Sequence, residues 1–135
     1  MIVMVALDDH QGLCFNHRRQ SRDRVLRDYM LDLAGDSGIW LNAYSASMFT
    51  EDTHTLHIAE DFLDQAGPGE YALVEDKAVR PYAGKIEKLI VFRGNRSYPA
   101  DMYFDLTPDD GWQLQSSRDF AGSSHDKITE EVYSR

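Results

Sequence analysis

The stretch Ile2-Val3-Met4-Val5-Ala6-Leu7, closed by Asp8-Asp9, is the segment from which the fold of this chain is best inferred. It is apolar without interruption and rich in β-branched side chains. A strand with one face in water alternates apolar and polar residues, whereas a continuous apolar run is typical of a strand covered on both faces. We therefore predict a central, buried strand at this position.

Further apolar runs have the same character and are separated by segments with helical spacing. Strands are predicted over residues 38–41, 71–74 and 88–92. A helix is predicted from Ser21, as its N-cap, to Gly35, with Asp23 in its first turn; residues 13–20 before it are predicted to be a loop. Shorter helices are predicted over residues 45–49 and 57–65, and a helix-like segment interrupted by Pro81 over residues 77–83. Strands that alternate with helices indicate an α/β sheet.

The last third of the chain has a different pattern. A short strand is predicted over residues 101–104, and residues 112–116 and 128–133 alternate in the way expected of an antiparallel pair. The C-terminal strands should therefore close one edge of the sheet in antiparallel fashion.

Length and charge limit the possible functions. The chain has 135 residues, 42% of them hydrophobic, and a formal net charge of −9, as expected of one folded domain spanning residues 1–135. An acidic surface argues against general nucleic-acid binding. The single cysteine, Cys14, excludes an internal disulfide and a thiolate zinc site. The apolar N-terminal run is too short for a signal peptide or a membrane span, so we expect a cytoplasmic protein with no membrane partner.

One short window has the opposite charge to the rest. Five arginines lie between Arg18 and Arg27, and together with Asp23 they give these ten residues a charge of +4, which leaves −13 for the other 125 residues. Like charges this close repel each other unless an anion lies among them. The window also runs into the predicted helix start, where backbone N–H groups attract anions.

Three segments carry a resemblance to a known family. Val5-Ala6-Leu7-Asp8 is followed by Gly12, Leu13 and Asn16; residues 72–79 lead through Tyr82-Ala83 to residues 88–91; and residues 101–104 precede Pro108-Asp109-Asp110 and Trp112. In this order they resemble the first strand and substrate loop, the cofactor strand with its helix and next strand, and the segment before the final hairpin of the dihydrofolate reductase family. The resemblance implies a shortened three-layer α/β/α domain, in which a mixed sheet has antiparallel C-terminal edge strands.

The chain departs from that family where the cofactor binds. Glu75-Asp76 stands where the family has two glycines, which let backbone amides approach a pyrophosphate. Asn42-Ala43-Tyr44-Ser45 replaces a basic run that binds the cofactor's phosphates, and only 20 residues separate Thr50 from Tyr71. We therefore expect no nicotinamide cofactor and no dihydrofolate reductase activity. A weaker association with the ribonuclease Z family has no motif behind it, because the run His-x-His-x-Asp-His is absent.

On the substrate side, the resemblance places Asp23 near the position where that family has the carboxylate that binds the pterin. Met102 stands where the family has the hydroxyl residue that assists this carboxylate. Arginines around Asp23 favour an anion over a flat pterin. The predicted ligand-binding residues are Asn16, Arg18, Arg19, Arg22 and Arg24.

Several interpretations of the arginine window stay open. It could hold an anionic small molecule, it could pair with the chain's own acids such as Asp8, Asp9, Glu75 and Asp76, or it could dock on a second copy to form a homodimer. Asp23 and His17 could also serve as an acid–base pair, which would make the protein a hydrolase or another acid–base enzyme. Whether it is an enzyme is therefore left open.

Two other candidates have simpler explanations. His54-x-x-His57, with Glu51, Asp52, Glu60 and Asp61, lacks a distant third ligand, so a surface cluster is favoured and no metal is predicted. Cys14 lies near basic residues, which would lower its pKa, but a small packed side chain is the preferred interpretation. The favoured function is thus a non-redox protein that binds a nucleotide or a phosphorylated metabolite.

Overall fold

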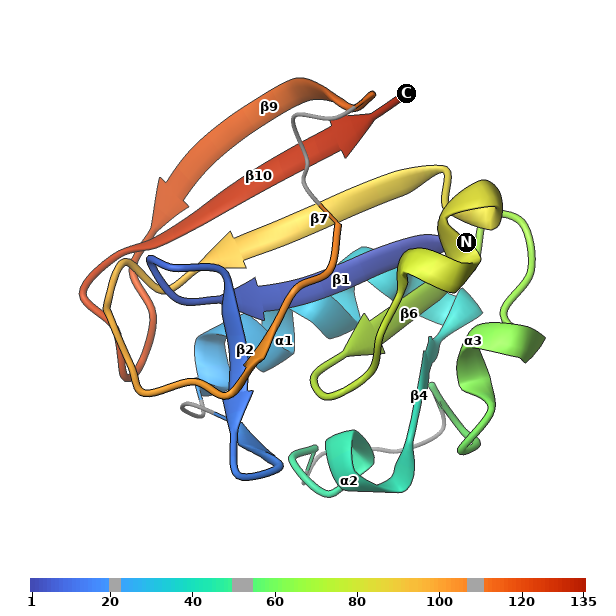
Figure 1. Ribbon diagram of the computed structural model, residues 1–135, viewed down its shortest axis with the longest axis horizontal. Coiled ribbons are helices and arrows are strands. Elements are labelled where there is room, and N and C mark those ends of the chain that lie inside the picture. Colours follow the sequence, from blue (N-terminus) through green and yellow to red (C-terminus); the bar gives the residue numbers. More distant parts are fainter. Residues whose placement is uncertain (20–22, 50–54, 107–110) are drawn as a thin grey trace.

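The computed structural model describes residues 1–19, 23–49, 55–106 and 111–135. Within these residues, seven strands form a mixed sheet in the order β5-β4-β6-β1-β7-β10-β9 (Figure 1). The parallel strands are β5 (Leu56–Ile58), β4 (Ile39–Leu41), β6 (Tyr71–Val74), β1 (Ile2–Leu7) and β7 (Lys88–Arg93). Strand β10 (Ile128–Ser134) runs antiparallel to β7 and pairs with β9 (Gln113–Phe120) at the edge. The predicted mixed sheet with antiparallel C-terminal edge strands is confirmed.

The first strand is central, as its sequence predicts. It pairs in parallel with β6 on one side and β7 on the other, and Val3, Met4 and Val5 are fully buried. Successive side chains of a strand point to opposite faces. Val3 and Val5 accordingly join one hydrophobic cluster while Ile2 and Met4 join the other.

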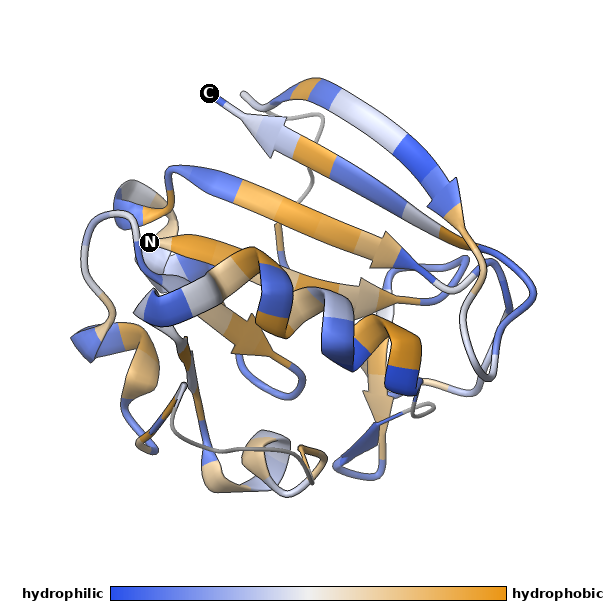
Figure 2. Cartoon of the chain, turned by 180° about the vertical axis from the view of Figure 1, so that it is seen from behind, coloured by the Kyte–Doolittle hydropathy of each residue, from blue (hydrophilic) through white to orange (hydrophobic). Residues whose placement is uncertain are grey.

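Helical segments cover both faces of the sheet. Helix α1 (Arg24–Ala34) lies against one face of the central part of the sheet (Figure 2), and its Met30 and Ala34 belong to the same hydrophobic cluster as Met4 and Phe92. The other face is covered by α3 (Phe62–Gln65) and the 3-10 helix η2 (Arg80–Lys85). Phe62 and Leu63 of α3 and Ile86, just after η2, belong to the hydrophobic cluster on this face. No helix in the described part of the chain is long and apolar enough to cross a membrane.

A second, small sheet corrects one prediction. Residues 13–20, predicted to be a loop, instead contribute β2 (Gly12–Phe15) and β3 (Arg18–Arg19), and β8 (Met102–Tyr103) pairs with β2 on its other side. The turn between β2 and β3 has φ of 53° at Asn16 and 60° at His17. Two consecutive positive φ angles are the signature of a two-residue hairpin turn, for which Asn is a preferred residue.

Other boundaries also differ from the predictions. The N-cap of α1 is Asp23, and Ser21, the predicted cap, lies outside the described residues, as do Pro108, Asp109 and Asp110. The helix predicted over residues 57–65 is wrong in its first half, because β5 pairs with β4 there and only α3 is helical. Helix α2 (Ala43–Ala46) begins two residues earlier than predicted, since Asn42 caps it by accepting from the Ser45 amide at 2.9 Å. After α1 the chain turns through the 3-10 helix η1 (Gly35–Ser37).

Candidate functional site

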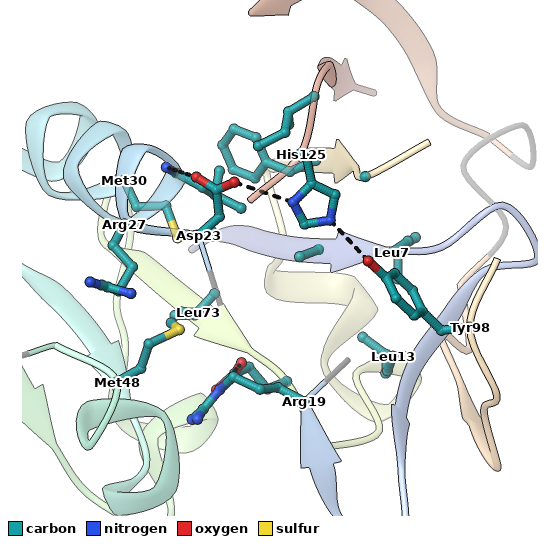
Figure 3. A pocket seen from close by; sticks show the side chains of 16 residues that line it. Leu7, Leu13, Arg19, Asp23, Arg27, Met30, Met48, Leu73, Tyr98 and His125 are labelled. Carbon is teal, nitrogen blue, oxygen red and sulfur yellow. Dashed lines mark hydrogen bonds and ion pairs between the residues drawn. The ribbon is translucent and has the colours of Figure 1, made fainter. Parts of the chain in front are cut away.

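A small cavity lies between α1 and the carboxyl ends of β1, β6 and β7. Its volume is about 60 Å³, room for about two water molecules at liquid density. Apolar side chains make up much of its wall, among them Leu7, Leu13, Met30, Met48 and Leu73. Polar side chains also border it: Arg19, Asp23, Arg27, Glu75, Tyr98 and His125 (Figure 3). The carboxyl ends of parallel strands are where open α/β sheets bind ligands.

Asp23 is held at the start of α1 by a complete set of hydrogen bonds. As the N-cap it accepts from the Leu26 amide at 3.1 Å. The loop between β9 and β10 supplies the other donors: the amides of Ser123 and Ser124, at 3.0 and 2.9 Å, and both of their hydroxyls, at 3.1 Å. The carboxylate therefore ties the start of the helix to a loop a hundred residues away.

A glycine makes this approach possible. At Gly122 a Cβ atom would lie within 3 Å of the Asp23 carboxylate and of the Ile128 side chain. Real Cβ atoms essentially never come so close to other heavy atoms, so only a residue without a side chain lets the loop backbone reach the carboxylate.

The hydrogen bonds set the charge of Asp23. Burial by itself would raise the pKa of this carboxyl group, but the amides of Ser123, Ser124 and Leu26 and the ring of His125 stabilise the ionised form and lower its pKa far below the usual range. Asp23 is therefore a fixed negative charge at all physiological pH values.

His125 and Tyr98 extend the hydrogen bonds of Asp23 along the cavity. His125 Nδ1 lies 3.2 Å from Asp23 Oδ2, and His125 Nε2 lies 3.3 Å from Tyr98 Oη (Figure 3). Both Asp23 and His125 are buried, with 4% and 7% of their surface exposed. Gly94 leaves space for the imidazole, since a Cβ there would lie 3.0 Å from Nε2.

Tyr98 is positioned from the end of the central strand. Asp8, which follows β1 and is 1% exposed, accepts from the Tyr98 amide at 3.1 Å and from the amides of His10 and Gly12 at 2.8 and 2.7 Å. Burial raises the pKa of Asp8, but these three amides outweigh it, so its pKa is lower than usual.

The opposite side of the cavity is closed by an ion pair. Arg19 Nε and Nη2 donate to the two oxygens of Glu75 at 2.9 and 3.1 Å. Arg19 also donates to the Tyr44 carbonyl at 3.0 Å, and its guanidinium lies 4.3 Å from the centre of the Tyr44 ring. Burial alone would lower the pKa of Arg19, but the bonds to Glu75 raise it. Here the chain's own acid neutralises an arginine of the window, one of the alternatives raised by the sequence.

The predicted ligand-binding residues are partly brought together. Asn16, Arg18 and Arg19 line one open groove of about 360 Å³, with Phe15, Tyr98 and Pro99. Arg24 is exposed at the first turn of α1, where its amide donates to Ser123 Oγ at 2.8 Å, and Arg22 lies outside the described residues. The groove shares Arg19 and Tyr98 with the cavity.

The histidine that contacts Asp23 is not His17, its predicted acid–base partner. His17 is exposed in the β2–β3 turn, whereas the imidazole that contacts Asp23 belongs to His125. The sequence offers no local signal for this contact, because the two residues are 102 positions apart. The run Gly122-Ser123-Ser124-His125 is the one clue, since glycine and serines are typical of a loop that binds a carboxylate through its amides.

The remaining sequence candidates take structural roles. Among the described residues, no group of three or more His, Cys, Asp or Glu side chains could hold a metal ion. His57 stacks on Trp40 with ring centres 4.8 Å apart, while Glu51, Asp52 and His54 lie outside the described residues. Cys14 is buried, in agreement with the preferred interpretation of a small packed side chain, and burial together with Asp76, Asp101 and Glu75 raises its pKa rather than lowering it.

Glu75 and Asp76, which follow β6, are also engaged within the protein. Glu75 pairs with Arg19, and Asp76 Oδ1 accepts from the side-chain Nδ2 of Asn42 at 3.0 Å. Both residues directly follow the end of β6.

Comparison with solved structures identifies the fold. The fold is that of dihydrofolate reductase. A structure described as dihydrofolate reductase from Enterococcus faecalis complexed with NADP(H) and RAB-propyl superposes with a TM-score of 0.70, covering 99% of this chain and 95% of that chain. Sequence identity is 9%, so the likeness concerns the fold alone. No protein-family model and no curated protein matches the chain.

Proposed function

We propose that this chain is a non-redox binding protein that holds an anionic small molecule, either a nucleotide or a phosphorylated metabolite, beside the β2–β3 hairpin and the start of α1. The observation that carries the proposal is the groove of about 360 Å³ lined by Asn16, Arg18 and Arg19. These residues come from a window that is rich in arginine within an acidic chain.

The two arginines of the groove have different roles in the proposed binding. Arg19 is fixed by Glu75 and Tyr44, so its charge is already compensated. Arg18 is exposed on β3 and provides the cation that can turn toward an anion. A guanidinium binds phosphate or carboxylate with two parallel N–H donors, which is why arginine suits this task.

Aromatic groups favour a ligand that also has a flat or apolar part. Phe15 is 51% exposed next to Arg18, and Tyr98 forms the boundary between the groove and the cavity. An aromatic ring and a guanidinium side by side can stack on a ring of the ligand and bind its charged group. The negative side chain of Asp76, which accepts from the uncharged Asn42 side chain beyond β6, supports a role without the nicotinamide cofactor, because a carboxylate repels its phosphates.

Calorimetric titration with a series of nucleotides and sugar phosphates tests the proposal. A ligand should bind to the wild type, and Arg18→Ala should weaken it by about tenfold or more, because a hydrogen bond to a charged group contributes about 1.5–3 kcal/mol. Lys88→Ala is the matched control, since it removes one positive charge from an exposed position at the N-terminal end of β7. Equal weakening by both variants, or no binding by any member of the series, would refute the proposed site.

A further inference from the structure

The chain Asp23–His125–Tyr98 along the cavity has the arrangement of a proton relay. Its three members come from the start of α1, the β9–β10 loop and the segment after β7, and all three border the cavity. We propose that Tyr98 and His125 are catalytic residues that take a proton from a bound molecule, with Asp23 as their positioning residue. This gives the fold an acid–base activity in addition to binding.

The tautomer of His125 follows from its neighbours. The Asp23 carboxylate is ionised and can only accept, so Nδ1, 3.2 Å away, is the nitrogen that bears the proton. Nε2 is then an acceptor, and Tyr98 Oη at 3.3 Å donates to it. The hydroxyl of Ser124, 3.1 Å from both Asp23 Oδ2 and His125 Nδ1, donates to the carboxylate. The relay is therefore set to move a proton from Tyr98 to His125.

The proton transfer balances without any co-reactant. As Tyr98 Oη takes a proton from a carbon next to a carbonyl group, its own proton passes to His125 Nε2. One C–H and one O–H bond break, and one O–H and one N–H bond form. The electron pair of the C–H bond stays on the ligand as an enolate, and the reverse transfer to the same or another carbon completes an exchange or an isomerisation.

The surroundings stabilise both charges that this step creates. The imidazolium forms against the Asp23 carboxylate, whose hydrogen bonds keep it ionised rather than letting it take the proton. The enolate forms in a cavity whose wall also includes Arg27 and the Glu75-paired Arg19, and N–H donors held in place before the reaction can stabilise a developing negative charge. In Figure 3, Arg19 lies across the cavity from His125.

The size of the cavity limits what reacts there. About 60 Å³ admits the reacting end of a small molecule, such as a methyl ketone group, rather than a whole nucleotide. The groove shares Tyr98 with the cavity, so an anionic group in the groove and a carbonyl in the cavity fit one molecule. The substrate class is therefore an anionic carbonyl compound, and in this respect the inference rests on the proposed function.

Proton–deuterium exchange separates the two proposals. The methyl protons of pyruvate, which is anionic, and of acetone, which is not, exchange through an enolate, and NMR in D₂O follows their loss. Wild-type protein should accelerate exchange of both, and of pyruvate more. Tyr98→Phe and His125→Gln should slow both probes by about 10²-fold or more, the range of general acid–base catalysis. Arg18→Ala should slow only pyruvate.

Controls exclude exchange at the surface and effects of folding. His10→Gln removes an exposed imidazole in the turn after β1 and should leave both rates unchanged. Tyr98→Phe keeps the ring, and urea unfolding shows whether it stays folded. A Tyr98→Phe protein that is folded and exchanges at the wild-type rate overturns the relay, as does exchange that depends on His17 instead of His125.

The remaining outcomes also decide between the proposals. Equal acceleration of pyruvate and acetone that is lost in His125→Gln supports the relay and counts against the anion site. Nitrogen-15 NMR of the imidazole gives an independent test: the Nδ1–H tautomer is expected for His125, and the Nε2–H tautomer would overturn the assignment.

Discussion

Two carboxylates border the cavity from opposite sides, and they are stabilised in different ways. Asp23 accepts from uncharged donors, three of them backbone amides, and from the ring of His125. Glu75 is paired with a single opposite charge, the guanidinium of Arg19. Both are mostly buried, with the side chain of Asp23 2% and that of Glu75 12% exposed.

The difference has consequences for stability and for chemistry. A backbone amide cannot be removed together with the carboxylate it serves, so any loss of Asp23 leaves buried donors unpaired. An ion pair can be removed as a unit, and its two charges then disappear together. Asp23 is therefore suited to remain permanently ionised. The Glu75–Arg19 pair is suited to hold the β2–β3 hairpin against the cavity.

Replacement of Asp23 should have the largest effect. Asp23→Ala removes the cap of α1 and leaves the amides of Ser123, Ser124 and Leu26 without their acceptor, so we expect a loss of about 3–5 kcal/mol in the free energy of unfolding. Urea denaturation followed by circular dichroism measures it. Asp28→Ala, at an exposed position of the same helix, should change stability by less than about 0.5 kcal/mol. Similar values for the two variants would show that the hydrogen bonds to Asp23 contribute little.

The ion pair on the other side should behave as a unit. Arg19→Met leaves Glu75 with a mostly buried, unpaired charge and should cost about 2–3 kcal/mol, less than for a fully buried pair because Glu75 retains some exposure. In the double variant with Glu75→Leu, most of that loss should be recovered. A double variant whose loss equals the sum of the two single losses would mean that the two groups do not act as a pair.

The close approach at Gly122 should be the next in size. Gly122→Ala places a methyl group against the Asp23 carboxylate, and overpacking of this kind costs about 1–3 kcal/mol. Gly84→Ala is the matched control, because its methyl group would enter open space at an unstrained backbone position. If the two variants have the same stability, the loop must move aside at little cost.

The sequence predicts the frame of this fold better than its small second sheet. Continuous apolar runs identify the central parallel strands, since only a strand covered on both faces can be apolar throughout. The β2–β3 hairpin is missed because its strands are only four and two residues long and β3 consists of two arginines. Its turn also depends on positive φ angles at Asn16 and His17, which residue type only weakly suggests. Strand β5 is missed because pairing with β4 overrides its helical spacing.

The candidate site, like the fold, can be predicted from the sequence only in part. The arginine window stands out in the sequence as a run of positive charge in an acidic chain, and Asp23 lies within it. Three of the predicted ligand-binding residues do share a groove. The partner of Asp23 is not visible, because the β9–β10 hairpin brings His125 to it across 102 residues. The ion pair of Arg19 with Glu75 likewise follows from the hairpin, which turns one arginine inward and leaves its neighbour Arg18 exposed.

Lowering the pH should remove the contribution of Asp23 to the free energy of unfolding, and this is the smallest effect we expect. The folded pKa of Asp23 is lowered below its unfolded value of about 3.9, so its contribution to stability is complete above that pH and is lost as the pH falls toward the folded pKa. The difference in unfolding free energy between wild type and Asp23→Asn, measured by urea denaturation, should therefore be constant above about pH 5 and shrink below about pH 3.9. Asp8, whose pKa is also lowered, is present in both proteins and cancels in the difference. A difference that stays constant into strong acid would show that the amides of the β9–β10 loop do not stabilise the charge of Asp23, and with it the basis for treating Asp23 as the fixed charge beside His125 would be lost.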